Sequence, residues 1–218
     1  MLDKKRSFDL ASSVFILLMM IPLGLIAYPF LAFLVGKPII FEQERIGKNG
    51  KKFKLYKLRS MKKNADSIKN KYLSKNEAPS PMFKIMDDPR FLKKEFGFFL
   101  FKKPYQIEVG KFLSRSGIDE IPQIINVIKG EMSLVGPRPL PVKEAQALEK
   151  IDKNWHKWRH QVKPGIFSAW AFDDHHNKSF DYWKKLERET LKMSAPKQIK
   201  IILQIIFKQI KNTIKERL

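Results

Sequence analysis

Two adjacent carboxylates, Asp119 and Glu120, form the pattern in this sequence best suited to chemistry. The isoleucines around them recur at helical spacing, which predicts one helix that begins near Ser116 or Gly117 and ends at Lys129. In that frame both carboxylates lie in the first turn. Free N–H groups and the helix dipole favour anions there.

A capping role and a chemical role both fit this position. Ser116, followed three residues later by Asp119, is close to a capping box. Pro122 would fall just inside the helix, and a proline in a helix interior costs roughly 3 kcal/mol. We therefore expect Pro122 to distort the turn that bears the carboxylates, which is a costly choice for capping alone.

Arg138 stands between Pro137 and Pro139, so its backbone is extended and restricted. A guanidinium held in this way is suited to bidentate capture of a phosphate. The alternative is a rigid loop with an exposed arginine.

A β-hairpin is predicted upstream, where residues 39–41 and 53–58 flank a turn at 47–50. Arg45, Lys57 and Arg59 would project near the turn and the strand ends. They could hold a phosphate, or they could be solvated charges on a hairpin.

A run of 27 uncharged residues, 10–36, is long enough to cross a bilayer and too long for the core of a signal peptide. Pro22 and Pro29 interrupt it, and lysines and arginines lie close to both ends. A spanning helix normally keeps its excess positive charge on one side. We therefore predict a helix that enters the membrane, breaks near Pro22 and returns to the same side; the alternative is a proline-kinked span.

Composition indicates an anionic partner. The chain of 218 residues carries 43 Lys and Arg against 22 Asp and Glu, a formal net charge of +21. Nucleic acid, anionic lipid and a phosphorylated substrate all fit this charge. The sequence contains no cysteine, which excludes a disulfide framework, a thiolate metal site and a cysteine nucleophile.

The C-terminal third adds aromatic and amphipathic signals. Trp155, Trp158 and Trp170 stand beside cations, as in a membrane interface or a nucleic-acid stacking surface, and the nearby histidines are expected at the surface. The aromatic segment 96–101 could likewise dip into a membrane or pack locally. From residue 196 onward isoleucines form a stripe beside lysines, and this helix could lie on anionic lipid or pack on the domain.

Several motifs in order carry a specific resemblance. They are Lys5-Arg6-x-Phe8-Asp9, Gln43-x-Arg45-x-Gly47, Tyr56-Lys57-Leu58-Arg59-Ser60-Met61, Asp88-Pro89-Arg90, the block from Asp119 to Pro139 and Lys163-Pro164-Gly165-Ile166. Together they resemble the bacterial sugar transferase family, the monotopic polyprenyl-phosphate phosphoglycosyl transferases.

The resemblance implies an enzyme that moves a sugar phosphate from a nucleoside diphosphate sugar, usually a UDP-sugar, to undecaprenyl phosphate and releases UMP. It implies that Asp119 is the nucleophile of a covalent phosphosugar intermediate and that Glu120 helps to hold Mg²⁺. It places Arg138 in the phosphate-binding environment, with Arg115 and Arg59 as weaker candidates for the same anion. This chemistry agrees with the general behaviour of carboxylate nucleophiles and Mg²⁺ at phosphates.

The chain departs from the family pattern at two places that bear on the site. Gly117 replaces the serine that usually stands before Leu-Asp-Glu, and the residues from 167 to 174 differ from the family's usual Thr-Gly, Gln-Val and Gly-Arg. These changes concern the identity of the nucleotide sugar more than the chemistry. An inactive membrane-anchored scaffold of the same fold is therefore the alternative function, and a membrane-tethered nucleic-acid binder a third.

The expected fold class is α/β, mostly helical with a short β-hairpin. The protein is expected to be monotopic, with an N-terminal re-entrant helix and interfacial amphipathic helices. The predicted parts are the membrane helix at 1–36, a cytoplasmic catalytic domain at 37–195 and a basic amphipathic helix at 196–218. We expect Pro22, Pro122, Pro137 and Pro139 to be structural. The expected partners are a nucleoside diphosphate sugar, polyprenyl phosphate and the lipids of the bacterial inner membrane, without nucleic acid.

Overall fold

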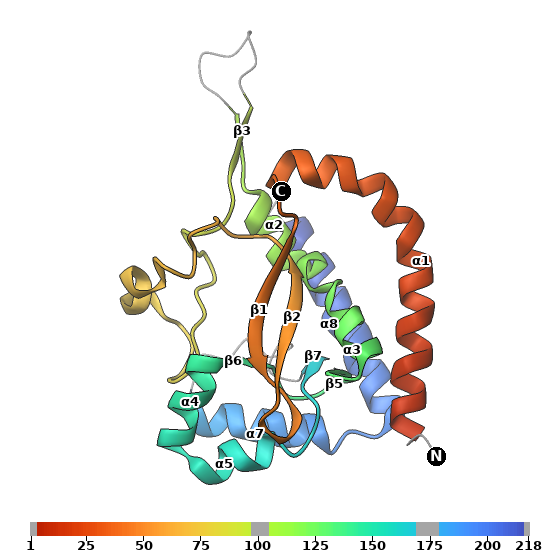
Figure 1. The fold of residues 1–218 in the computed structure, drawn as a ribbon, viewed down its shortest axis with the longest axis vertical. Coiled ribbons are helices and arrows are strands. Elements are labelled where there is room, and N and C mark those ends of the chain that lie inside the picture. Colours follow the sequence, from red (N-terminus) through yellow and green to blue (C-terminus); the bar gives the residue numbers. More distant parts are fainter. Residues whose placement is uncertain (1–3, 97–104, 169–178, 216–218) are drawn as a thin grey trace.

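The computed structural model describes residues 4–96, 105–168 and 179–215. The fold is mostly helical with short strands, as predicted (Figure 1). The aromatic segment from 97 onward, Trp170 and the divergent residues 169–174 lie outside the described residues.

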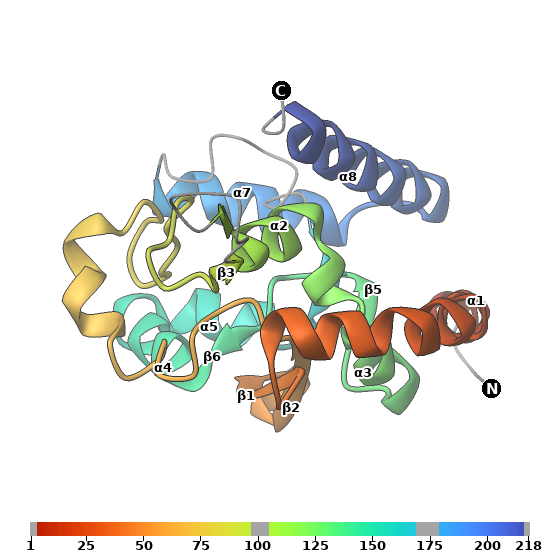
Figure 2. The same cartoon turned by 90° about the horizontal axis from the view of Figure 1, so that it is seen from above.

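The apolar run forms one long helix, α1 (Lys4–Val35), which is bent into two arms (Figures 1 and 2). Pro22 and Pro29 lie inside it, and each removes a backbone donor, which accounts for a bend. The sequence predicted a break near Pro22, whereas α1 is one bent helix that continues through both prolines. Nearly all of its middle part is exposed, including Leu18, Leu25 and Ile26.

Both ends of α1 are fastened to the same folded domain. At the N-terminal end, Arg6 donates hydrogen bonds to the carbonyl oxygens of Val127 (2.6 Å) and Ile128 (3.0 Å), and the buried Asp9 accepts one from Ser133 Oγ (2.6 Å). At the C-terminal end, Val35 is buried in a second apolar cluster with Ile39, Val109 and Leu113. The exposed apolar stretch of α1 thus lies between two ends that are attached to the same domain.

The predicted hairpin is confirmed and is longer than expected. Strand β1 (Ile40–Ile46) pairs antiparallel with β2 (Lys52–Leu58) around a 3-10 turn at Lys48–Gly50, in a register that sets Phe41 opposite Lys57. Strand β6 (Leu140–Pro141) adds to the other edge of β1. This pairing draws the loop that follows β5 (Ser133–Val135) towards the hairpin.

The predicted central helix is wrong in its first half, because residues 118–120 form a 3-10 turn and the α-helix begins only at Gln123. Helix α2 (Val109–Ser116) ends at Gly117 in the left-handed conformation, a 3-10 turn η3 (Ile118–Glu120) follows, and α3 (Gln123–Lys129) begins after Pro122. Gly117 ends the first helix because its φ of +72° is a conformation that glycine adopts without strain. The helix end at Lys129 and Gly130 is confirmed.

Pro122 consequently lies at the start of α3 and not in a helix interior, so the expected interior cost does not arise. Ser116 Oγ donates a hydrogen bond to the Leu113 carbonyl oxygen (3.2 Å) and accepts one from the Ile118 N–H (3.4 Å), one residue short of the Asp119 N–H that a capping box would use. The capping-box alternative is therefore not what the structure shows.

The remaining elements complete the fold, and the helices among them contribute buried side chains to the main core. They are the antiparallel pair β3 (Lys94–Phe96) and β4 (Tyr105–Ile107), strand β7 (Gly165–Phe167) parallel to β5, the 3-10 segment η2 (Lys69–Lys75), and helices α4 (Val142–Ile151), α5 (Lys153–Arg159), α7 (Phe180–Leu191) and α8 (Ala195–Lys215). Trp155 is buried in the core, where it stacks on Trp158 at 4.3 Å between ring centroids. The expectation that these tryptophans serve an interface is wrong, and His160 is also buried.

Helix α8 lies behind α2, on the side away from the hairpin (Figure 2). Ile201 and Ile205 are buried in the core, whereas Leu203, Phe207 and Ile210 are exposed. The alternative of packing on the domain is confirmed for one face of this helix, and the other face is an exposed apolar stripe.

Gly117 offers a test of the segment that carries the carboxylates. A Cβ at Gly117 would lie about 2.5 Å from the side-chain amide of Gln209 on α8, while Gly50 has a similar φ of +73° and open space. Gly50→Ala should lower the free energy of unfolding by roughly 1–2 kcal/mol, because alanine is strained in the left-handed conformation. Gly117→Ala should lower the melting temperature further, because it adds the steric clash.

Thermal unfolding of the detergent-solubilised variants measures this difference. Adding Gln209→Ala to Gly117→Ala should bring the melting temperature back to that of Gly50→Ala. Equal losses for the two glycine variants would show that α8 does not press on this turn.

Candidate functional site

The two carboxylates lie beside a lysine from the hairpin. Lys57 Nζ is 2.8 Å from Glu120 Oε1 and 3.6 Å from Asp119 Oδ2. Lys57 reaches them because β2 crosses the η3 turn, where its side chain is only 19% exposed. The structure thus brings together three of the side chains that the sequence singled out.

Asp119 is the more deeply placed of the two acids. Its side chain is 4% exposed, and Ser60 Oγ donates a hydrogen bond to Oδ2 (3.4 Å). The other oxygen, Oδ1, is buried without a hydrogen-bond partner among the described residues. A buried carboxylate oxygen without a partner is costly to keep, and such an atom at a cleft is a feature of reactive or ligand-binding groups.

The pKa values of the two acids shift in opposite directions because their surroundings differ. Burial raises the pKa of Asp119 to about 6 against the opposing charge of Lys57, and the neighbouring Glu120 adds to the rise. Burial acts on Glu120 in the same direction, but the charges of Lys57 and Arg138 outweigh it and lower the pKa of Glu120 below its ordinary value. Such divergence within one pair is typical of sites that do chemistry.

Arg138 is held over this site through its backbone by two other arginines. Arg159 donates to the carbonyl oxygen of Arg138 (2.7 Å), and Arg45 donates to that of Pro139 (2.7 Å). Arg159 is itself fixed by a buried ion pair with Glu187 (2.7 Å). The flanking prolines were the only part of this support visible in the sequence.

Arg45 therefore has a supporting position. Its guanidinium is buried and also contacts Gln43, and burial together with the charge of Arg138 lowers its pKa to about 10. Even so lowered, Arg45 is charged at neutral pH and adds positive potential near the carboxylates.

Two predicted anion ligands lie in other contacts. Arg59 donates to the carbonyl oxygens of Val35 and Lys37, so its guanidinium closes the end of α1. Arg115 pairs with Asp87 (2.8 Å), next to the ion pair of Lys111 with the same acid (2.6 Å). In this structure neither guanidinium is engaged with the carboxylates.

Lys84 is a charged group that the sequence analysis missed. Burial, and then the charge of Arg138, lower its pKa to about 8, while Glu120 acts in the opposite direction. Lys84 thus lies in the field of both. The signal in the sequence was weak, because a lysine between Phe83 and Ile85 in an irregular segment has no periodic pattern to single it out.

The carboxylates have donor atoms suited to Mg²⁺. No group of three acidic, histidine or cysteine side chains gathers within the described ranges. Mg²⁺ does not require one, since it commonly binds one or two carboxylates, waters and substrate phosphates. Glu120, with its low pKa and partly exposed side chain, and the unpaired Oδ1 of Asp119 fit that description.

Comparison with known proteins shows that the carboxylate site lies within a stretch that matches one protein family. The family described as "Bacterial sugar transferase" matches residues 2–216. The galactosyl transferase CpsE of Streptococcus agalactiae is 39% identical over 170 residues, which are 77% of this chain and 34% of that protein. The exopolysaccharide production protein ExoY of Sinorhizobium fredii is 31% identical over 180 residues, 81% of this chain and 71% of ExoY.

The undecaprenyl-phosphate galactose phosphotransferase of Salmonella typhimurium is 30% identical over 182 residues, 81% of this chain and 34% of that protein. The chain thus spans about a third of the length of two of these relatives and most of the third. The similarity covers the hairpin, the carboxylate turn and the Arg138 loop together.

The raised pKa of Asp119 predicts how stability depends on pH. A carboxyl whose folded pKa exceeds its unfolded value contributes stability at low pH that is lost as pH rises through about 6. Asp119→Asn removes this titration. The variant should therefore gain stability relative to the parent between pH 4 and 7, by about 3 kcal/mol at most.

Melting temperatures measured across this range in EDTA test the prediction. Asp152→Asn is the matched control. The backbone N–H of Trp155 donates a hydrogen bond to Asp152 and lowers the pKa of that carboxyl, so this variant should lose stability relative to the parent as pH rises. An Asp119→Asn difference that stays constant with pH would show that this carboxyl is not strained by burial.

Proposed function

Because the chain belongs to the bacterial sugar transferase family, we propose that it moves a sugar 1-phosphate from a nucleoside diphosphate sugar, a UDP-sugar by preference, to undecaprenyl phosphate. The printed names of the relatives, a galactose phosphotransferase and an exopolysaccharide production protein among them, support a role in the first membrane step of glycan assembly. The observation that carries the proposal is the buried Asp119 with one oxygen unpaired beside a second carboxylate and several cations.

The chemistry proceeds in two displacements at one phosphorus. Asp119 attacks the phosphorus that bears the sugar, an O–P bond forms, and the bond to the bridging oxygen breaks to release the nucleoside monophosphate. The phosphate of the acceptor then attacks the same phosphorus, the aspartyl O–P bond breaks, and the carboxylate is restored. A carboxylate nucleophile divides one difficult transfer into two easier ones.

The surrounding residues position phosphates and offset their charge. Arg138, on its doubly supported backbone, and Lys84 supply positive charge where the diphosphate must enter, and Lys57 holds Asp119 and Glu120 in place until the donor arrives. Mg²⁺, held by Glu120 and substrate phosphates, supplies charge neutralisation of the diphosphate when bound. The charges of Lys57 and Arg138 oppose the effect of burial and favour the ionised form of Asp119.

The attachment of α1 supports a monotopic, re-entrant placement. Both of its ends are bound to one domain while its apolar middle is exposed, which suits a helix that dips into the bilayer and returns. The exposed apolar stripe of α8 would extend the lipid-facing surface, and the positive charge near both ends of α1 favours a catalytic domain on the cytoplasmic side of the inner membrane.

Asp119→Asn should abolish the release of nucleoside monophosphate from a UDP-sugar, because an amide cannot form the acyl phosphate. Glu120→Gln should retain slow turnover and require more Mg²⁺. A coupled UMP assay with the protein in nanodiscs, run over a panel of UDP-sugars, measures both. Full activity of Asp119→Asn would refute the assignment, and no release by the parent with any donor would favour the scaffold alternative.

Lys84→Met should weaken donor binding, because a charged hydrogen bond to phosphate is worth about 1.5–3 kcal/mol, or roughly 10- to 150-fold in KM. Lys84→Arg should restore most of the loss. Lys62→Met is the matched control, since this lysine is exposed in the irregular segment that precedes it. An unchanged donor KM in Lys84→Met would remove Lys84 from the phosphate site.

A further inference from the structure

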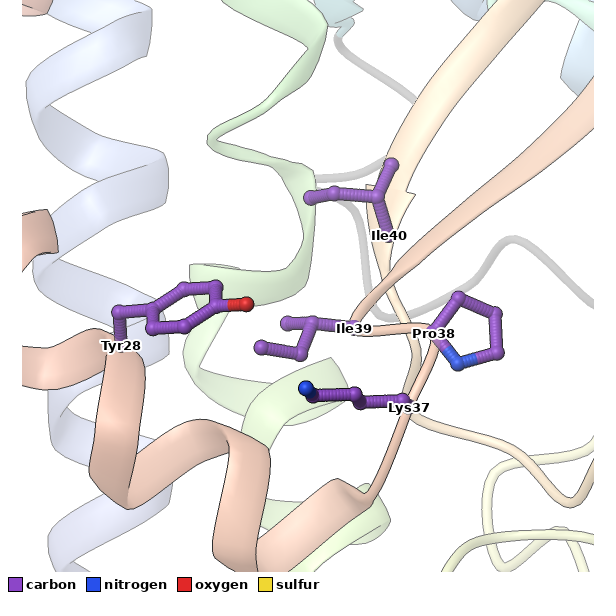
Figure 3. A pocket seen from close by; sticks show the side chains of 5 residues that line it. All are labelled: Tyr28, Lys37, Pro38, Ile39 and Ile40. Carbon is purple, nitrogen blue, oxygen red and sulfur yellow. The ribbon is translucent and has the colours of Figure 1, made fainter.

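A cavity of about 560 Å³ opens where α1 leaves the lipid-facing region and the chain enters β1. Its walls are Tyr28 of α1, the link residues Lys37, Pro38 and Ile39, and Ile40 of β1 (Figure 3). This volume lies within the range of roughly 300–1,000 Å³ that is usual for ligand pockets. None of these residues belongs to the carboxylate site described above.

The walls of the cavity are suited to a hydrocarbon chain. They are mostly apolar, and Ile40 remains 41% exposed although it begins a strand of the central hairpin. Tyr28 belongs to α1, and apolar side chains on either side of it in the sequence, Ile26 and Phe30, are exposed. A cavity with such walls, continuous with an apolar helix surface, favours a lipid chain over a sugar or a nucleotide base, which need polar partners.

Two polar groups stand at the edge of this cavity. The hydroxyl of Tyr28 and the ammonium of Lys37 both point toward the space around Ile39 (Figure 3). A cation and a hydroxyl donor beside hydrocarbon walls match a ligand with an anionic head and an apolar tail. An uncharged lipid tail alone would leave the cation without a function there.

The cavity is connected to the nucleophile by a short path through the hairpin. The carbonyl oxygen of Ile39 accepts a hydrogen bond from the backbone of Arg59 (2.7 Å), and the next residue, Ser60, bonds to Asp119. Phe41, one residue beyond Ile40, is paired across the hairpin with Lys57, which contacts both carboxylates. The cavity is therefore lined by residues next to the hairpin positions that contact the carboxylates.

We propose that this cavity binds the phosphate-proximal isoprenoid units of the polyprenyl phosphate acceptor, with Lys37 and Tyr28 facing its phosphate. The assignment of the ligand rests on the proposed function. The two substrates would then approach by different routes. The donor would bind near Arg138 and Lys84, and the acceptor would enter from the bilayer along α1.

Photo-crosslinking tests the site directly. A polyprenyl phosphate with a diazirine in the isoprene unit next to the phosphate is irradiated with the full chain in nanodiscs, and the labelled peptides are mapped by mass spectrometry. We expect labels within residues 28–40 that excess unlabelled polyprenyl phosphate suppresses. Suppression by phosphatidylglycerol to the same extent, or labels only elsewhere, would overturn the proposal.

Two variants separate this site from the carboxylate chemistry. Ile40→Trp fills the cavity, and Lys37→Gln removes its cation; each should raise the acceptor KM roughly tenfold or more, the effect of losing about 1.4 kcal/mol. The UMP released before any acceptor is added should stay unchanged. Ile151→Trp and Lys51→Gln, at exposed positions distant in the chain, are the controls.

The outcomes distinguish the two proposals. Normal acceptor dependence in Ile40→Trp and Lys37→Gln, with UMP release that depends on Asp119, would overturn the cavity assignment and leave the proposed function standing. Competed labels at 28–40 in a protein that releases no UMP would support the cavity and refute the transferase reaction.

Discussion

The contact of Lys57 with Asp119 and Glu120 is the interaction on which the rest of the structure depends. Two carboxylates at adjacent positions of a buried turn repel each other and lose hydration, so the fold must supply a cation at the same place. The hairpin supplies it, because β2 crosses the turn. Gly117 and Pro122 supply the turn itself, since one ends α2 and the other begins α3. The site is thus assembled from segments about 60 residues apart, as the ion pair of Lys57 with Glu120 shows.

The same domain fixes the membrane helix at both ends, which couples the site to the bilayer. Arg6 and Asp9 attach the first turns of α1 to α3 and β5, and Arg59 closes its last turn one residue before Ser60, which contacts Asp119. A rigid link of this kind keeps the nucleophile at a constant depth relative to the lipid. Under the proposed function, a water-soluble sugar nucleotide and a lipid-soluble acceptor would meet at Asp119.

Sequence patterns predicted the elements that local chemistry determines. The apolar run, the hairpin turn and the glycine after Lys129 each carry their own signal, and all three are present. The isoleucine spacing predicted one helix from Ser116 or Gly117 to Lys129, where the chain makes a 3-10 turn and then a shorter α-helix, because periodicity records burial and not backbone conformation. Trp155, Lys84 and the Arg159–Glu187 pair were misread or missed because tertiary packing alone defines their surroundings. The carboxylate pair itself was predicted, whereas its lysine was one of several cations until the strand register placed it.

The covalent intermediate at Asp119 is the central claim, and mass spectrometry of the digested protein tests it most directly. The protein in nanodiscs is mixed with a UDP-sugar and Mg²⁺ without acceptor and quenched in acid, and the digested peptides are sequenced. The account predicts one added sugar phosphate, located on the peptide at Asp119, which disappears when polyprenyl phosphate is supplied. Transfer of sugar phosphate to the acceptor without any such adduct, or an adduct on another residue, would contradict it.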